Sequence, residues 1–181
     1  MTLFNQTFTP VQLFTGIIYS PTIQLKQLLS IVEESFNQSI LLTSLPIDFS
    51  HSSYYEHEMG PNLKRIFVGF NALIAPQQGY TYKLKAVQTE ERHKINGNRK
   101  FNLDPGIISM HNLILYSTKN FSHRMACNSG IYAEVTCLFK RKSLSYLEWT
   151  YPDFKVQAHQ HFFLNLRSGY KNKLRRLNYE F

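Results

Sequence analysis

The chain has 181 residues, of which 43% are hydrophobic and 18% are charged, and its formal net charge at pH 7 is +8. This length suits one domain, and this composition is typical of a packed globule, which excludes a disordered chain and a disulfide-stapled miniprotein. No stretch approaches the roughly 18 uninterrupted apolar residues of a membrane span, and the first ten residues lack a signal-peptide pattern, so we expect a single cytoplasmic domain over residues 1–181.

The first half of the chain predicts strands and helices in the order of a ferredoxin-like unit, βαββα. Apolar runs rich in β-formers indicate the strands, and apolar residues that recur every three or four positions indicate the helices. Pro46 is expected to limit the second strand, and residues 54–61 to form a polar and aromatic connection. The expected strands are Val11–Ser20, Ile40–Phe49 and Leu63–Ile74, and the expected helices are Ile23–Phe36 and Tyr80–His93.

A further helix is expected to begin at Asp104, directly after a brief strand at Lys100–Leu103. In the sequence Asp-Pro-Gly, Asp suits the N-cap and Pro suits the first helical position. The apolar face of this helix would be formed by Ile107, Met110, Ile114 and Leu115.

A β-hairpin and a long terminal helix are expected in the last third of the chain. The sequence Asn-Ser-Gly at residues 128–130 predicts a tight turn that pairs Ser122–Cys127 with Ile131–Lys140. Ser143–Trp149 can add a strand, and an amphipathic pattern predicts a helix from Val156 onward. These elements favour an α+β fold, with an antiparallel or mixed sheet and helices packed on one side of it.

Neither cysteine is expected to form a disulfide. In the hairpin, Cys127 lies beside the turn and Cys137 stands about ten residues along the returning strand, roughly 25–30 Å away. Both are therefore predicted to be reduced thiols, partly buried.

Six short blocks carry a family resemblance: LFTGIIYS, YYEHEMGPNLKRIFVGF, FNLDPG, STKNFSHR, GIYAEVT and WTYPDF. Through these blocks, in this order, the chain resembles an uncharacterised prokaryotic family, number 4416 among domains of unknown function. The resemblance spans nearly the whole chain and implies no established activity. The family pattern has an acidic residue after the Thr-Lys pair, where this chain has Asn120.

Ionisable side chains gather inside or beside these blocks. Two of them, Asp104 and Asp153, are expected first as helix-cap or turn residues, because each precedes an expected helix. The alternative is that the helix end at Asp104 receives an anionic ligand. The whole set is Asp104, Lys119, His123, Arg124, Glu134 and Asp153.

Glu134 lies in the middle of the returning strand of the expected hairpin. Alternation puts Tyr132, Glu134 and Thr136 on one face of this strand, opposite a core face that runs from Ile131 to Cys137. Because an unpaired buried carboxylate is costly, Glu134 is expected to face water or to lie in a cleft with a cationic partner.

The hairpin register places Glu134 across from His123 or Arg124, which predicts a cross-strand ion pair. In the competing functional interpretation, His123 and Glu134 form a general-base pair, while Lys119 or Arg124 holds an anionic group. The spacing of these residues permits both interpretations.

A second polar segment covers residues 50–60. Tyr54, Tyr55 and Glu58 are predicted to line a ligand pocket, because aromatic side chains with a polar tip are common in such walls. Histidines and glutamates in the same segment match no known ligand spacing, so no metal site is predicted.

The leading hypothesis is an enzyme-like or ligand-binding domain for a small anionic metabolite or nucleotide. Its catalytic residues would be His123 and Glu134. Its ligand-binding residues would be Lys119, Arg124, Tyr54, Tyr55, Glu58, Asp104, Tyr132, Thr136 and Asp153. The residues name no cofactor, no reaction and no oligomeric state.

Two other functions remain open. An RNA-binding or ribonucleoprotein-associated module would use the basic terminal helix, whose cations are Lys171, Lys173, Arg175 and Arg176. Cations at a helix C-terminus also favour the helix dipole and keep its outer face solvated, which is the simpler interpretation. The third possibility is a structural interaction protein, which would lack a cleft near Glu134.

Overall fold

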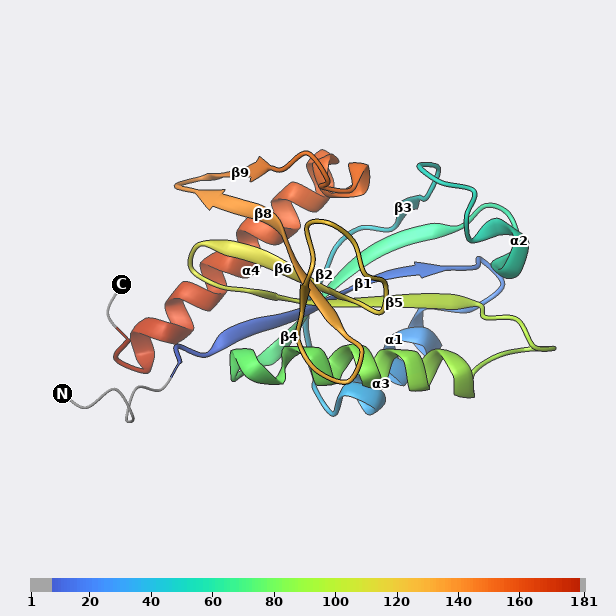
Figure 1. Ribbon diagram of the computed structural model, residues 1–181, viewed down its shortest axis with the longest axis horizontal. Coiled ribbons are helices and arrows are strands. Elements are labelled where there is room, and N and C mark those ends of the chain that lie inside the picture. The colour runs from blue at the N-terminus through green and yellow to red at the C-terminus, as the bar shows by residue number, and fades with distance from the viewer. Residues whose placement is uncertain (1–7, 180–181) are drawn as a thin grey trace.

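The computed structural model describes residues 8–179, which contain nine strands and four α-helices (Figure 1). The strands are β1 (Val11–Tyr19), β2 (Ile40–Thr43), β3 (Ile47–Asp48), β4 (Lys64–Ile74), β5 (Phe101–Ile108), β6 (Asn112–Ser117), β7 (Met125–Ala126), β8 (Tyr132–Lys140) and β9 (Ser143–Tyr146). The helices are α1 (Leu25–Phe36), α2 (Glu56–Met59), α3 (Gly79–Arg92) and α4 (Gln157–Arg176), with 3-10 turns at η2 (Pro76–Gln78) and η3 (Pro152–Lys155). No helix within residues 8–179 is long and apolar enough to cross a membrane.

The strands form one sheet, in the order β2-β4-β1-β5-β6-β8-β7, with β3 beside β4 and β9 beside β8. The assigned strand pairs are antiparallel, and with the helices they confirm the α+β class. The first half has the expected ferredoxin-like element order, and its sheet order β2-β4-β1-β5 is that of the same unit.

Two expected boundaries in the first half change. The strand expected at 40–49 is divided into β2 and β3, and Pro46 lies in the break, as its missing N–H requires. The connection expected at 54–61 contains the short helix α2.

The helix expected from Asp104 is wrong. Residues 101–108 form β5, which pairs along its whole length with β1, and β6 follows. A Cβ at Gly106 would collide with the carbonyl oxygen of Ile114 on β6, so glycine allows the two strands to approach. Pro105 lies just outside the residues of β5 that pair with β6, so its missing N–H costs no hydrogen bond to that strand. Pairing with β1 thus overrides the local cap signal.

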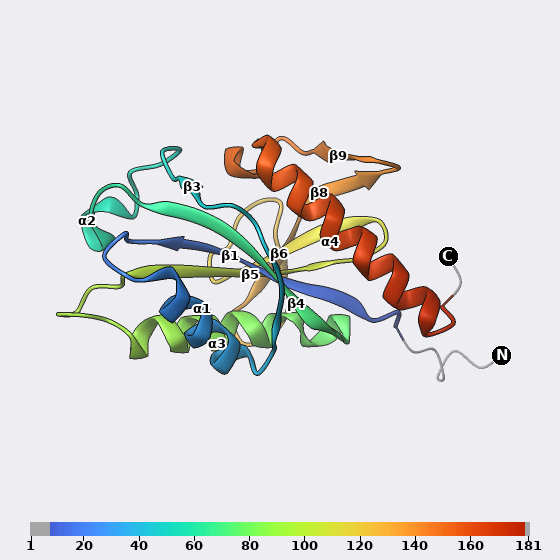
Figure 2. The same cartoon turned by 180° about the vertical axis from the view of Figure 1, so that it is seen from behind.

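Helices cover both faces of the sheet, which corrects the expectation of one covered side. On the first face, α1 and α3 pack against one set of strand side chains, among them Leu13 and Ile17 of β1. On the second face, α4 packs against the other set, among them Phe14 of β1 and Phe67 of β4. Figures 1 and 2 show α1 and α3 below the sheet and α4 above it.

The expected hairpin is shorter than predicted, because β7 pairs with β8 only at Met125 and Ala126. The main partner of β8 is β6, and their register shifts so that Thr136 is an extra residue on β8. The shift resets the alternation: Ala133 faces the core under α1 and α3, whereas Cys137 faces the core under α4. The single core face predicted for this strand is therefore wrong. Both cysteines are free thiols, as expected, with Cys127 exposed and Cys137 buried.

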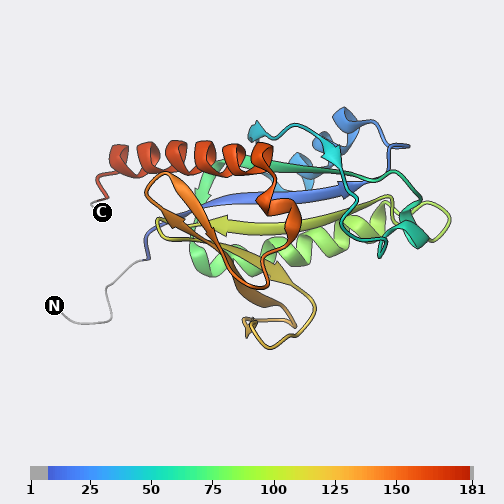
Figure 3. The same ribbon diagram turned by 90° about the horizontal axis from the view of Figure 1, so that it is seen from above.

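The sheet splits between β5 and β6. These strands pair only from Gly106 to Ile108, whereas β6 continues along β8 as far as Ser117. Seen from above, β6 and β8 turn away from β5 (Figure 3). Leu103 pairs with β1 on one side, and on the side that the split leaves without β6 its backbone is bound by α3. Its N–H donates to Glu90 Oε1 at 2.8 Å, and its carbonyl accepts from Lys83 Nζ at 2.7 Å.

Candidate functional site

A cavity of about 440 Å³ lies at the split between β5 and β6. Its walls come from the second face of the sheet, from α3, from the segment before α2, from the loop after β6 and from η3. This size suits a small organic ligand. Of the predicted site residues, those that line the cavity are Tyr54, Tyr55, Asp104, Lys119, Arg124, Glu134 and Asp153.

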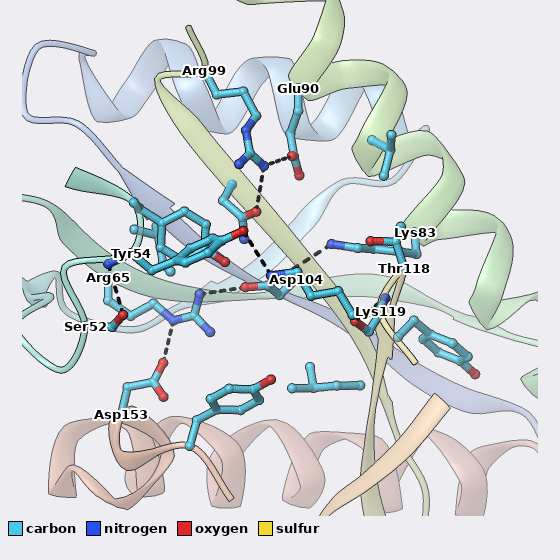
Figure 4. A pocket seen from close by; sticks show the side chains of 18 of the residues that line it. Ser52, Tyr54, Arg65, Lys83, Glu90, Arg99, Asp104, Thr118, Lys119 and Asp153 are labelled. Atoms are coloured by element: carbon cyan, nitrogen blue, oxygen red, sulfur yellow. Dashed lines mark hydrogen bonds and ion pairs between the residues drawn. The ribbon is translucent and has the colours of Figure 1, made fainter. Parts of the chain in front are cut away.

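Asp104 and two cations form the centre of the cavity floor (Figure 4). Arg65 on β4 places Nη1 at 3.2 Å and Lys83 on α3 places Nζ at 3.4 Å from the Asp104 carboxylate. The other side of Arg65 meets Asp153, with Nε 2.8 Å from Oδ2. Arg65 is 3% exposed, and its guanidinium occupies the space that a side chain at Gly16 would fill. Asp104 and Asp153 are thus ion-pair partners of one buried arginine. Asp104 caps no helix, whereas Asp153 does lie in the 3-10 turn η3 before α4, as expected.

The ionisation of Asp104 is controlled by this cluster. Burial by itself would raise the pKa of the Asp104 carboxyl, but Lys83 and Arg65 outweigh it and hold the pKa below its ordinary value. Asp104 is therefore an anion at neutral pH, and its side chain is 26% exposed toward the cavity.

Arg99 is the centre of a second charged cluster, at the cavity wall beside α3. Its guanidinium binds Glu58 through Nε at 2.9 Å and Nη2 at 2.7 Å, and it binds Glu90 through Nη1 at 2.8 Å. The hydrogen bonds from Arg99 lower the pKa of Glu58 to about 2. Glu58 itself lies behind Arg99 and does not line the cavity, in contrast to its predicted role as a pocket wall.

Glu134 forms the predicted ion pair, in a third cluster on the β8 wall. Its Oε2 lies 2.7 Å from Arg124 Nε and 3.1 Å from His123 Nε2. The carboxylate is 1% exposed, so it lies in a cleft with cationic partners, one of the two outcomes expected for it. Arg124 also donates to Ser117 Oγ at 3.1 Å and to Tyr151 Oη at 2.9 Å.

His123 stands behind this wall. Its ring stacks on Trp149 with centroids 4.7 Å apart and planes 8° apart, and it does not line the cavity. Tyr132 and Thr136 also lie outside the lining, and Thr136 donates to Glu134 Oε1 at 3.3 Å. The general-base role of His123 and Glu134 stays a prediction.

Lys119 and Tyr54 meet at the rim of the cavity. Figure 4 shows their side chains extending toward each other from opposite sides, one from the loop after β6 and the other from the segment before α2. Lys119 Nζ donates to Tyr54 Oη at 3.1 Å and lies 4.3 Å from the centroid of the Tyr54 ring. Among the cavity cations of the described chain, only Lys119 has no carboxylate within ion-pair distance.

Among the polar cavity residues that sequence reasoning missed, those that form its charged clusters or contact them are Arg65, Lys83, Glu90, Arg99 and Asn102. Two of them had a signal in the sequence, because Arg65 interrupts a mostly apolar strand and Lys83 lies in a helix with many polar residues. The other three, Glu90, Arg99 and Asn102, are close in sequence, on α3, on the loop after it and on β5, but their contacts form only because α3 packs along β5. No group of three metal-ligating side chains is arranged to hold an ion within the described chain.

The basic terminal helix is partly structural. Lys173 donates to Gln12 Oε1 at 3.0 Å and to the Asn71 carbonyl, which ties α4 to β1 and β4. Nucleic-acid binding by this helix stays a prediction.

The chain matches the family model described as Domain of unknown function (DUF4416) over residues 9–170. No curated protein and no solved structure matches it significantly.

Proposed function

The chain belongs to the DUF4416 family of domains of unknown function, and we propose that it binds a small anionic metabolite or nucleotide in the cavity between β5 and β6. The observation that carries the proposal is the uncompensated charge of Lys119 at the cavity rim. Without Lys119, the cavity residues that the structure describes would offer no unpaired positive charge to attract an anion.

The charges inside the cavity otherwise balance. Arg65 faces Asp153 and, with Lys83, Asp104, while Arg99 faces Glu90 and Arg124 faces Glu134, so these four cations meet four carboxylates. These pairs keep the interior polar and fix its shape, but they leave no excess of positive charge for a ligand. The ligand's anionic group therefore belongs at Lys119.

In the absence of a ligand, Lys119 donates its hydrogen bond to the Tyr54 hydroxyl. A neutral hydroxyl is a weaker partner for an ammonium group than a phosphate or carboxylate, so an anion replaces it at a gain in free energy. The rings of Tyr54, Tyr55 and Tyr151 then offer apolar surface to the rest of the ligand.

Binding is the function that the geometry supports best, ahead of catalysis. Glu134 faces the cavity but is occupied by Arg124 and Thr136, and His123 is stacked on Trp149. The cavity also favours ligand binding over an interaction protein that lacks a cleft near Glu134.

The test is thermal unfolding with a panel of nucleoside monophosphates, sugar phosphates and small carboxylates. A ligand at about 100 times its Kd stabilises the folded protein by about 2.7 kcal/mol, which raises Tm measurably. Lys119→Met should weaken binding of the stabilising compound about 10- to 100-fold, because it removes a charge-assisted hydrogen bond.

The matched control is Lys142→Met, which removes an exposed cation outside the cavity. Equal affinity in Lys119→Met and the wild type would reject Lys119 as the anion site. If the whole panel leaves Tm unchanged and a single-stranded RNA binds with a steep loss at higher salt, the basic terminal helix becomes the better proposal.

A further inference from the structure

Asn102 places an unused hydrogen-bond donor in the cavity floor. It lies on β5 and is 4% exposed. Its Oδ1 accepts from Arg99 Nη1 at 3.2 Å, and because a guanidinium can only donate, this contact fixes which end of the amide faces Arg99. The amide nitrogen must then point away from Arg99, and no acceptor of the described chain completes a hydrogen bond to it.

The neighbouring carboxylate does not satisfy this donor. Lys83, Arg65 and a weak hydrogen bond from the Asn102 amide together outweigh burial and lower the pKa of Asp104. That contact is not at full hydrogen-bonding geometry, and it leaves the amide nitrogen without a well-placed acceptor. A buried donor without an acceptor is unfavourable, and such groups in folded proteins are normally met by a ligand or an ordered water. Asn102 lines the cavity, so the ligand can supply the acceptor.

We infer that Asn102 and Asp104 together select a hydroxyl group on the ligand whose anionic group Lys119 holds; this inference rests on the proposed function. A hydroxyl oxygen accepts one hydrogen bond from the Asn102 amide while its hydrogen is donated to the Asp104 carboxylate. A second anionic group is disfavoured at this position, because Asp104 would repel it.

The ligand class is therefore a small hydroxylated anion with its charge at the rim and a hydroxyl on the floor. The anion can be a phosphate or a carboxylate, since Lys119 recognises both as oxygen anions. A carbonyl in place of the hydroxyl would satisfy Asn102 alone and would leave Asp104 facing a lone pair.

The test compares pairs of probes that differ by hydroxyl groups. Glycerol 3-phosphate and n-propyl phosphate form the phosphate arm, and glycerate and propionate form the carboxylate arm, with Kd measured by calorimetry. We expect the wild type to bind the hydroxylated member of at least one arm about tenfold or more tightly than its partner, because the partner leaves the Asn102 amide unpaired.

Two variants remove the donor. Asn102→Asp keeps an acceptor for Arg99, and Asn102→Ala adds no charge, so the second carries the test if the first unfolds. Asn102→Ala should bind the hydroxylated probe about tenfold more weakly and bind the plain probe as the wild type does. Asn102→Asp adds a negative charge, so it should weaken both anionic probes, and the hydroxylated one more than the plain one. Asn71→Asp, on β4 and outside the cavity, is the control.

The outcomes separate the two proposals. Equal wild-type affinity for both members of each pair, or unchanged discrimination in the folded variants, overturns the hydroxyl inference and leaves the anion cavity intact. Failure of all four probes and of the wider ligand panel removes the cavity's proposed function, and this inference falls with it.

Discussion

Arg99 shows how single residues set the acid stability of the site. It donates to Glu58 through Nε and Nη2, and the pKa of Glu58 falls to about 2 as a result. A carboxyl whose folded pKa lies below its unfolded pKa stabilises the protein above the unfolded value. This contribution is therefore complete above pH 4.5 and is lost as the pH falls from 4.5 toward 2.

Glu58→Gln should make the protein less stable at pH 7 by about 1 kcal/mol, a figure kept small because the Glu58 side chain is 28% exposed and solvent screens the pair. The difference from the wild type should shrink between pH 4.5 and pH 2, where the wild type loses the same interaction. Urea unfolding at pH 7 and pH 3 measures both effects. Glu56→Gln, on the exposed side of α2, should behave as the wild type, and a difference that stays constant with pH would contradict the argument.

The sequence predicted residues of the site better than their roles. The position of the tight turn, which is local information, placed His123 or Arg124 across from Glu134, and Glu134 contacts both of them. Asp104 was recognised as polar and distinctive, but its partner Arg65 lies 39 residues earlier, on a strand two places away in the sheet. Such a contact depends on the order of strands, which no local pattern contains.

At the scale of elements, β5 decides the shape of the site. Its sequence Asp-Pro-Gly is a sound local signal for a helix start, yet β1 offers a full antiparallel ladder and α3 binds the exposed backbone at Leu103. The expected helix at Tyr80–His93 was correct, but its polar residues were given no role in the site. Lys83 and Glu90 bind the backbone of Leu103 at the edge of β5, and both line the cavity.

Lys83→Met should therefore destabilise the protein by about 2–3 kcal/mol, because it leaves the Leu103 carbonyl without its donor and removes one cation from Asp104. Lys85→Met, on the same helix, should change stability by no more than about 0.5 kcal/mol, since its methylene chain can still pack on Tyr82. Urea unfolding at pH 7 gives both values. Equal losses in the two variants would mean that Lys83 contributes only as one more surface cation.

At the scale of the whole molecule, β1 joins the two cores. Leu13 and Ile17 face α1 and α3, whereas Phe14 faces α4, so neither face can lose its packing without disturbing the same strand. We therefore expect residues 8–179 to unfold as one domain in a single cooperative transition. Fluorescence of Trp149, the chain's single tryptophan, and far-ultraviolet circular dichroism should give coincident curves. Separate midpoints would indicate two independent units.

The contact between Gly69 and Leu166 tests this coupling, because it is where α4 rests on the middle of β4. A Cβ added at Gly69 would stand 2.5 Å from Leu166 Cδ1, and both residues are buried in the core, so Gly69→Ala should cost about 1–3 kcal/mol. Leu166→Ala leaves a cavity and should cost about 2–5 kcal/mol on its own.

In the double variant the new methyl group enters the space that Leu166 has vacated. The combined loss should therefore be smaller than the sum of the single losses by about 1–3 kcal/mol, measured by urea unfolding in a double-mutant cycle. Gly169→Ala is the matched control, since an added Cβ there meets nothing within 4 Å and alanine favours the helix, so it should stabilise the protein slightly. Strictly additive losses would show that α4 does not rest on β4 through Gly69. In that case the second core would need another contact to make the two faces unfold together.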